Sequence, residues 1–90
     1  MSSAWQIDFS PRARKAISKL DSKARARILT TLERDLDRHG DPRAFGDALV
    51  GDWTGFWRYR IGDYRVIARI EDGRVTVYVI EVGHRGDVYR

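Results

Sequence analysis

Three closely spaced arginines, Arg58, Arg60 and Arg65, are the residues of this chain best suited to chemistry on an anion. They stand in the run 57–65, WRYRIGDYR, where arginine alternates with aromatic or aliphatic side chains. A guanidinium group stays charged and can donate two parallel hydrogen bonds to a phosphate. The last residues add an imidazole, a further guanidinium and a phenol: His84, Arg85 and Tyr89. These residue types indicate a phosphate site with groups that can move protons.

The first of two turn signals, Gly62-Asp63, predicts how the arginines are positioned. Alternation with period two is typical of a strand with one apolar and one cationic face. A two-residue turn at Gly62-Asp63 pairs Ile61 with Tyr64 and Arg60 with Arg65. We therefore expect a hairpin that brings arginines from both strands onto one face.

The second turn signal, Asp72-Gly73, predicts a third strand and sets Glu71 against Arg74. Side chains that lie opposite one another share a face. The core face is then expected to carry Trp57, Tyr59, Ile61, Tyr64, Val66, Ala68, Ile70, Val75, Val77 and Val79. The other face is expected to carry Arg58, Arg60, Arg65, Ile67, Arg69, Tyr78 and Ile80. Because the third strand runs on past the first turn, we expect its last residues to arrive near the arginines: His84, Arg85 and Tyr89.

Arg60 opposite Arg65, with Arg58 beside them, is a local conflict. Like charges directly across a strand pair are destabilising, and no nearby carboxylate obviously offsets these. Such conflicts are expected where function has overridden stability, and a polyanion is the natural neutraliser. The alternative is that Arg58 and Arg60 are ordinary solvent-facing residues and that Arg65 pairs with Asp63 or Glu81.

Length and composition limit the classes of protein. The 90 residues are enough for one domain, 1–90. The chain has no cysteine and only two histidines, which exclude thiol chemistry and leave no metal or cofactor site to expect. No apolar run approaches the roughly 20 residues of a membrane span, and no signal-peptide core is present, so we expect a cytoplasmic protein. The net charge of +4 favours an anionic partner.

The first forty residues predict one strand and two helices. Residues 5–9 alternate as a short strand, and Ser10-Pro11 is a good helix start. Asp21 or Ser22 can cap a second helix, which ends near Gly40. The outer faces of both helices are basic, with Arg12, Arg14, Lys15, Lys19, Lys23, Arg25, Arg27, Arg34 and Arg38. The simple interpretation is a solvated surface, and a second hypothesis is a collective role in holding a nucleic-acid backbone.

Residues 41–55 read as a loop that Ala48, Leu49 and Val50 anchor to the core. The element order is therefore strand, helix, helix, loop and three antiparallel strands. This order predicts a two-layer α+β domain with a mainly antiparallel four-stranded sheet. Its open sheet edges suit a partner that adds a strand or lays a helix over the surface.

Runs 57–60 and 62–65, together with the tail Val82-Gly83-His84-Arg85 and Val88-Tyr89, resemble the RelE family of bacterial toxins within the RelE/ParE superfamily. The resemblance spans nearly the whole chain. It implies a RelE-like fold and a type II toxin that cuts messenger RNA in the ribosomal 30S A site. It also implies a RelB-like antitoxin that wraps around the toxin in a hetero-oligomer.

The resemblance assigns roles in a metal-independent cleavage by attack of the ribose 2′-OH on the adjacent phosphate. Arg58, Arg60 and Arg65 match positions that orient the phosphate and stabilise its developing charge. Arg85 matches the arginine that aids departure of the leaving oxygen, and Tyr89 matches a tyrosine that stacks on a base or helps with the proton.

One departure concerns the general base, since the best-known RelE pattern has lysines where Arg58 and Arg60 stand. Arginine does not deprotonate in proteins, so neither residue can be the base. His84 is then the candidate, because histidine titrates near neutral pH. Two other functions stay open: a ParE-like inhibitor of DNA gyrase, and a basic nucleic-acid-binding domain without catalysis.

Overall fold

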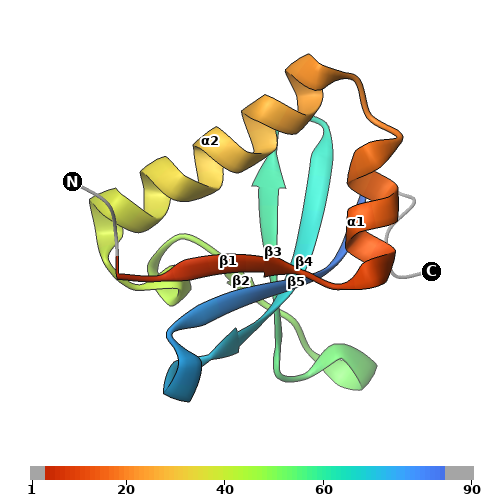
Figure 1. The fold of residues 1–90 in the computed structure, drawn as a ribbon. Helices are drawn as coiled ribbons and strands as arrows, with labels where there is room; N and C mark the ends of the chain where they lie inside the picture. Colours follow the sequence, from red (N-terminus) through yellow and green to blue (C-terminus); the bar gives the residue numbers. More distant parts are fainter. Residues whose placement is uncertain (1–3, 85–90) are drawn as a thin grey trace.

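The computed structural model describes residues 4–84, which form one sheet with two helices packed together on one of its faces (Figure 1). The helices are α1 (Pro11–Ser18) and α2 (Ser22–His39). The strands are β1 (Gln6–Phe9), β2 (Asp47–Ala48), β3 (Phe56–Ile61), β4 (Tyr64–Glu71) and β5 (Thr76–His84). Short 3-10 helices span Pro42–Ala44, Gly51–Trp53 and Asp72–Arg74.

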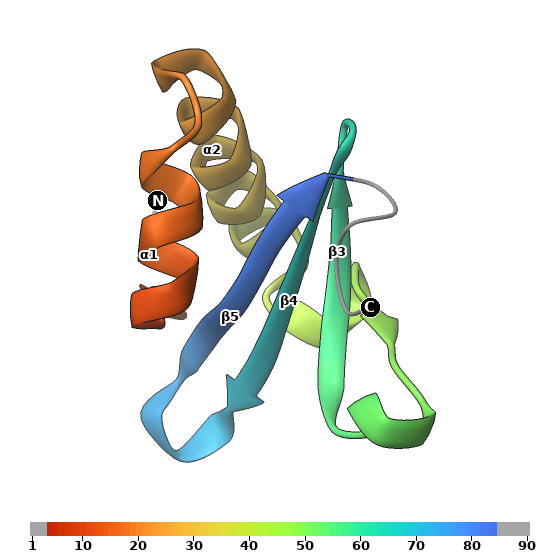
Figure 2. The ribbon, with the colours of Figure 1, turned by 90° about the vertical axis from the view of Figure 1, so that its right-hand side faces the viewer.

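The strand order in the sheet is β1-β5-β4-β3-β2, with β1 parallel to β5 and the other pairs antiparallel. Figure 2 shows β5, β4 and β3 side by side, with both helices on one side of them. The predicted two-layer α+β class and element order are confirmed. The sheet has a fifth strand, because the two residues of β2 come from the segment expected to be loop. Within residues 4–84 no helix is long and apolar enough to cross a membrane.

Both helices begin where the sequence predicts, and α2 also ends where it predicts. The Ser10 hydroxyl oxygen accepts a hydrogen bond from the Ala13 amide at 3.0 Å, with Pro11 following. A carboxylate oxygen of Asp21 accepts from the Ala24 amide at 2.8 Å. Gly40 ends α2 with φ 77°, a left-handed conformation that glycine adopts without strain. Capping thus sets both the length of α2 and the stripe that faces the sheet.

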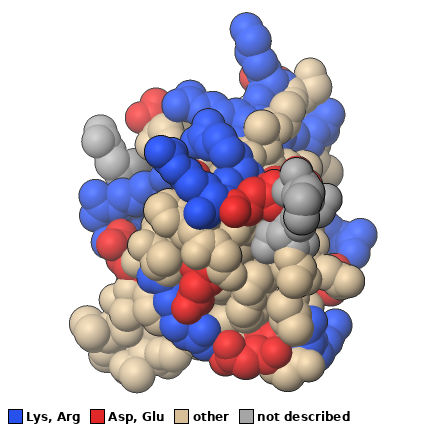
Figure 3. All heavy atoms as spheres, turned by 90° about the vertical axis from the view of Figure 1, so that its left-hand side faces the viewer, with Lys and Arg blue, Asp and Glu red and all other residues tan. Residues whose placement is uncertain are grey.

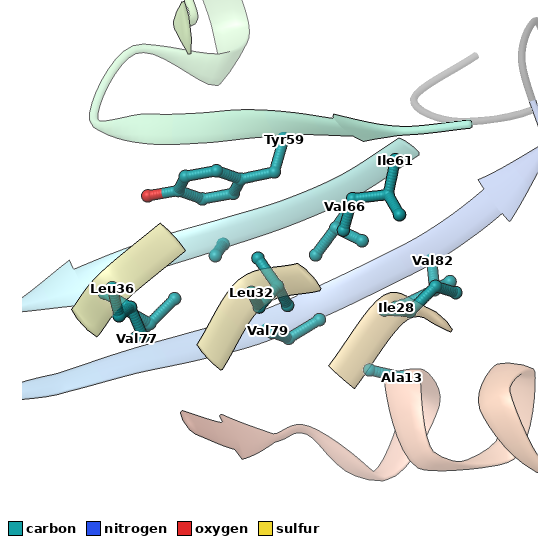
Figure 4. Packing of buried hydrophobic residues seen from close by; sticks show 11 residues of the cluster. Ala13, Ile28, Leu32, Leu36, Tyr59, Ile61, Val66, Val77, Val79 and Val82 are labelled. Carbon is teal, nitrogen blue, oxygen red and sulfur yellow. The ribbon is translucent and has the colours of Figure 1, made fainter. Parts of the chain in front are cut away.

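The core lies between the helices and the sheet (Figure 4). Ala13 of α1 and the i, i+4 series Ile28, Leu32 and Leu36 of α2 are at most 2 % exposed. The sheet contributes Tyr59, Ile61, Val66, Ala68, Val77, Val79 and Val82. Alternation along each strand sends the intervening side chains to the opposite face, where the described residues form no helix. We call these the helix-covered face and the arginine face.

The first hairpin has the predicted register, with Ile61 opposite Tyr64 and Arg60 opposite Arg65. The predicted register of the second hairpin is wrong, because Glu71 pairs with Thr76 instead of Arg74. The connection is a 3-10 turn that ends in a left-handed Val75, not a two-residue turn at Asp72-Gly73. The slip is two residues, so Val77 and Val79 keep their predicted face. Val75 itself is 38 % exposed and lies outside the core.

A bulge at Ile80 changes the alternation of β5. Ala68 pairs with Val79, but Ile67 pairs with Glu81, so Ile80 is the extra residue. The Ser10 hydroxyl donates to the Ile80 carbonyl at 3.2 Å, and the Ser10 amide donates to the Val79 carbonyl at 2.8 Å. The residue that caps α1 therefore also holds the bulge. Beyond it, even-numbered residues move to the helix-covered face, as buried Val82 shows.

We expect Ser10→Ala to lower the free energy of unfolding by about 2 kcal/mol, because it removes the helix cap and a donor to the bulge. Urea denaturation followed by circular dichroism measures the change. The matched control is Ser18→Ala, whose exposed hydroxyl donates only to the Lys15 carbonyl within its own helix. That variant should change stability by less than about 0.5 kcal/mol. Equal losses in both variants would show that Ser10 has no special role.

Candidate functional site

Arg58, Arg60 and Arg65 lie on the arginine face of two neighbouring strands. Arg58 is opposite Ile67 across β4, and Arg60 is opposite Arg65. Directly opposed side chains have Cβ atoms about 5 Å apart. The three arginine side chains thus extend from neighbouring positions near the Gly62-Asp63 turn, and we call this group the arginine patch. The side chain of Arg58 is 19 % exposed and that of Arg60 is 61 % exposed, so Arg60 is much the more open to solvent.

Asp47 of β2 lies against this patch, which corrects the expectation that no carboxylate offsets the arginines. It is the register partner of Arg58, and the Arg58 Nη2 atom donates to Asp47 Oδ2 at 3.2 Å. The Arg60 Nε atom is 4.0 Å from the same oxygen. Asp47 thus offsets part of the positive charge of Arg58 and Arg60. Asp47 also orders Arg58 through a charge-assisted hydrogen bond.

The loop before β2 is held by Tyr59, a residue of the helix-covered face. The Tyr59 hydroxyl donates to the Pro42 carbonyl at 2.9 Å, and burial raises the pKa of this phenol above its ordinary value. Its ring packs so closely on Gly46 that a Cβ there would lie 2.7 Å from a ring carbon. Gly46 immediately precedes Asp47, so this contact sets where the carboxylate enters the sheet.

The expected anchor of this loop, Ala48-Leu49-Val50, is wrong in large part. Val50 is 82 % exposed, Ala48 is exposed and only Leu49 is half-buried. Arg43 ties the loop to the far hairpin instead, because it donates to both carboxylate oxygens of Asp72 at 3.1 and 2.6 Å. These hydrogen bonds lower the pKa of the Asp72 carboxyl.

Arg69, the next arginine along the face, has different surroundings. Its Nε and Nη2 atoms donate to Glu71 at 3.1 and 2.8 Å. Its guanidinium carbon also lies 5.3 Å from the centre of the Tyr78 ring. Arg69 is thus neutralised by a carboxylate and by an aromatic ring, which sets it apart from Arg60.

His84 lies at the same end of the sheet as the arginines but on the other face. It pairs with Tyr64, and the two rings stack with centroids 4.6 Å apart. Gly83 takes the position opposite Arg65. His84 thus arrives at the end of the sheet where the arginines lie, as expected, but the bulge at Ile80 reverses the alternation and puts its side chain on the helix-covered face. Arg85 and Tyr89 lie outside the described residues.

Two neighbouring hollows mark the surface beside the arginine patch. The smaller, of about 170 Å³, is lined by Arg60, Gly62, Asp63, Tyr64 and Arg65. The larger, of about 530 Å³, shares Arg60 and Gly62 and extends to α2. Among residues 4–84, no three His, Asp or Glu side chains are grouped so as to hold a metal ion. The guanidinium groups that line both hollows can bind anions and stabilise developing negative charge.

Comparison with known proteins identifies the family. Residues 7–89 match the sequence model of a protein family, the ParE toxin of the type II toxin-antitoxin system parDE. Toxin RelG of Mycobacterium tuberculosis is 33% identical over 86 residues, which cover 96% of this chain and 97% of that protein. The chain belongs to the RelE/ParE superfamily of type II toxins.

Solved structures agree with the fold of this toxin. The toxin-antitoxin complex RelBE2 from Mycobacterium tuberculosis matches with a TM-score of 0.80 and 30% identity, over 94% of this chain and 95% of that one. The isolated RelE toxin of E. coli matches with a TM-score of 0.70 and 29% identity, over 96% and 92%. The identification made from the runs 57–65 and 82–89 is confirmed at the level of the family.

Sequence reasoning missed two residues that shape the toxin's arginine patch, Asp47 and Ser10. Asp47 stands in a segment rich in turn residues and pairs across the sheet with a strand eleven residues later. Ser10 was recognised as a helix cap, but its contact with Ile80 joins residues 70 positions apart. Nothing in the local pattern signals either contact.

Gly46→Ala should lower the free energy of unfolding of the toxin by about 1–3 kcal/mol, because the added methyl group meets the buried Tyr59 ring. Urea denaturation measures it. Gly73→Ala is the matched control, since a Cβ at Gly73 meets nothing within 4 Å. A stable Gly46→Ala variant would mean that the loop shifts without cost and that Tyr59 does not position Asp47.

Proposed function

We propose that this toxin is a ribosome-dependent endoribonuclease that cuts messenger RNA in the 30S A site, without a metal ion. The observation that carries the proposal is the cluster of Arg58, Arg60 and Arg65 on the face of the described sheet opposite the helices, with Asp47 ordering Arg58. The likeness to curated toxins RelG and RelE supports the same reaction class. The cleavage is attack of a ribose 2′-OH on the adjacent phosphate.

The arginines act on the phosphate as its charge grows. A guanidinium pair donating to the nonbridging oxygens stabilises the pentacoordinate transition state more than the ground state. Arg60 and Arg65 stand directly opposite one another, which suits them to hold one phosphate from two sides. Arg58 is ordered by Asp47 and orients the strand. A phosphate bound between Arg60 and Arg65 accepts charge-assisted hydrogen bonds from both.

The proton steps are assigned to residues near the end of the chain. None of the three arginines can accept a proton, so His84 is the proposed general base. Its exposed ring is stacked on Tyr64 beside the Gly62-Asp63 turn. The 2′-OH lies next to the bound phosphate, so the imidazole must leave this stack and turn toward the arginine face to accept the proton. By resemblance, Arg85 assists the leaving oxygen, and Tyr89 stacks on a base or helps with the proton.

We also propose that a RelB-like antitoxin holds the toxin inactive in the cytoplasm. Two of the similar structures are the complexes RelBE2 of Mycobacterium tuberculosis and RelBE of E. coli. Co-expression with an antitoxin encoded beside this chain should restore growth and yield a complex that copurifies.

A second candidate is inhibition of DNA gyrase, and it is favoured by the ParE description of the matching family model. A toxin of that type needs no phosphate-cleaving cluster. Mapping of RNA ends separates the two functions, because codon-phased cuts report cleavage in the A site and DNA breaks without such cuts report gyrase.

Arg60→Gln and Arg65→Gln should each lower the cleavage rate roughly 10²–10³-fold, because each removes a donor to the developing charge. The measurement is single-turnover cleavage of messenger RNA on purified ribosomes, with growth arrest on expression as a second readout. Arg69→Gln is the matched control on the same face and should cleave at the normal rate. If both site variants remain fully active and toxic, or the wild type cuts nothing, the nuclease assignment fails.

His84→Gln should lower the same rate by about 10²–10⁴-fold and remove the pH dependence that a general base imparts. The matched control is His39→Gln, because His39 lies at the end of α2 and stacks on Phe45. A slow variant that keeps the wild-type pH profile would mean that His84 has a structural role. A variant that cleaves normally would place the base elsewhere.

A further inference from the structure

Beyond the proposed site, the larger hollow joins the turn between β3 and β4 to the exposed side of α2. It is lined by Arg27, Thr30, Thr31, Arg34, Asp35, Arg60, Ile61 and Gly62. Its volume of about 530 Å³ falls in the range of ligand clefts, about 300–1,000 Å³. Figure 3 shows Lys and Arg side chains gathered over the upper part of one face, at the height of α2 and this turn.

The α2 side of the hollow is one helical stripe of hydrogen-bond donors. Arg27, Thr30, Thr31 and Arg34 follow the i, i+3, i+4, i+7 spacing that places side chains on one helix face. This stripe is distinct from the buried stripe of Ile28, Leu32 and Leu36. The helix therefore packs on the sheet with one face and presents cations and hydroxyls with another.

Close packing of Arg27 on Gly62 connects the helix to the turn. Atoms of the Arg27 guanidinium would lie 2.9–3.0 Å from a Cβ at Gly62, so the group sits directly over the glycine. Gly62 has φ 58°, which glycine also tolerates best. Because Gly62 and Arg60 line both hollows, Arg27 continues the row of guanidinium groups that begins at Arg65 and Arg60.

The charge of the two hollows favours an extended anion. Four arginines, Arg27, Arg34, Arg60 and Arg65, line the hollows together with the carboxylates Asp35 and Asp63. Asp47 lies 4.0 Å from Arg60, so the arginines still outnumber the nearby carboxylates. Asp35 lies 3.6 Å from the Arg34 Nε atom, too far for a good hydrogen bond. The lining of the larger hollow includes no aromatic side chain on which a base could stack. Such a surface binds phosphate groups and does not read bases.

We propose that this groove on α2 binds the phosphodiester backbone of the RNA strand whose neighbouring phosphate is held by Arg60 and Arg65. This inference rests on the proposed function, which identifies the strand as RNA. The position of the groove follows from the α2 residues alone. Guanidinium groups at Arg27 and Arg34 contact nonbridging oxygens, and the hydroxyls of Thr30 and Thr31 donate to the same groups. The groove holds nucleotides beyond the cut without regard to their sequence.

The test compares two noncleavable 2′-O-methyl RNA oligonucleotides of uridine, a trimer and a nonamer, by fluorescence anisotropy with the full-length toxin. Arg27→Gln/Arg34→Gln should weaken nonamer binding roughly tenfold or more at 0.1 M salt. The slope of log K against log salt should fall by about 1.4, or 0.7 for each lost single-strand phosphate contact. Trimer binding, which needs only Arg60 and Arg65, should stay unchanged.

The control Arg14→Gln/Lys15→Gln removes the same charge from exposed residues of α1 outside the groove. Thr30→Val keeps the net charge and should still weaken nonamer binding severalfold. If both double variants lose the same nonamer affinity, the effect comes from the overall positive charge and not from the groove. That result would overturn the proposal. So would a groove variant that keeps its RNA affinity but no longer binds an acidic antitoxin.

The failure of the nuclease proposal would look different. A wild-type toxin that binds the nonamer through α2, yet cuts nothing on the ribosome, leaves the groove intact and removes the proposed function. In the opposite case the wild-type toxin cleaves normally, and the Arg27→Gln/Arg34→Gln variant binds the nonamer as tightly as wild type. That result would refute the groove and leave the proposed nuclease function standing.

Discussion

The division of one sheet into a helix-covered face and an arginine face is the constraint on which the rest of this toxin depends. Both helices pack on a single face, where Ile28, Leu32 and Leu36 meet the valines of β4 and β5. Strand alternation then sends every second residue away from the helices. The arginines of β3 and β4 reach the opposite face for this reason. The free energy gained by burying the apolar core stabilises strands whose other face carries arginines. An isolated hairpin with that cationic face would not be stable.

Carboxylates moderate the repulsion along the arginine face. Asp47 pairs with Arg58 and lies at the limit of contact with Arg60, while Arg69 shares Glu71 with Arg74. Exposed ion pairs of this kind contribute little stability, about 0–1 kcal/mol. Arg60 and Arg65 remain opposed across the strands, as expected for a surface arranged to receive an anion. The same cationic row continues over Gly62 to α2.

The end of β5 shows how a single extra residue redirects a functional group. The bulge at Ile80 is held by Ser10, and it carries His84 from the arginine face to a stack on Tyr64. Bulges are common beside active sites because they re-aim side chains. The proposed general base and the proposed phosphate-binding groups thus start on two faces of the sheet. The proposed mechanism therefore requires His84 to turn around Gly62-Asp63 toward the arginines.

The sequence by itself determined the features that depend on local periodicity: the helix caps, the buried stripes, the first hairpin and the patch of Arg58, Arg60 and Arg65. The motif at 57–65 also determined the family. Tertiary structure alone decided the register of β5 and the bulge that moves His84. It also decided the contacts of Asp47 with Arg58 and of Arg27 with Gly62. These join distant segments, and their geometry follows from packing of the whole sheet against α2, which no local pattern encodes.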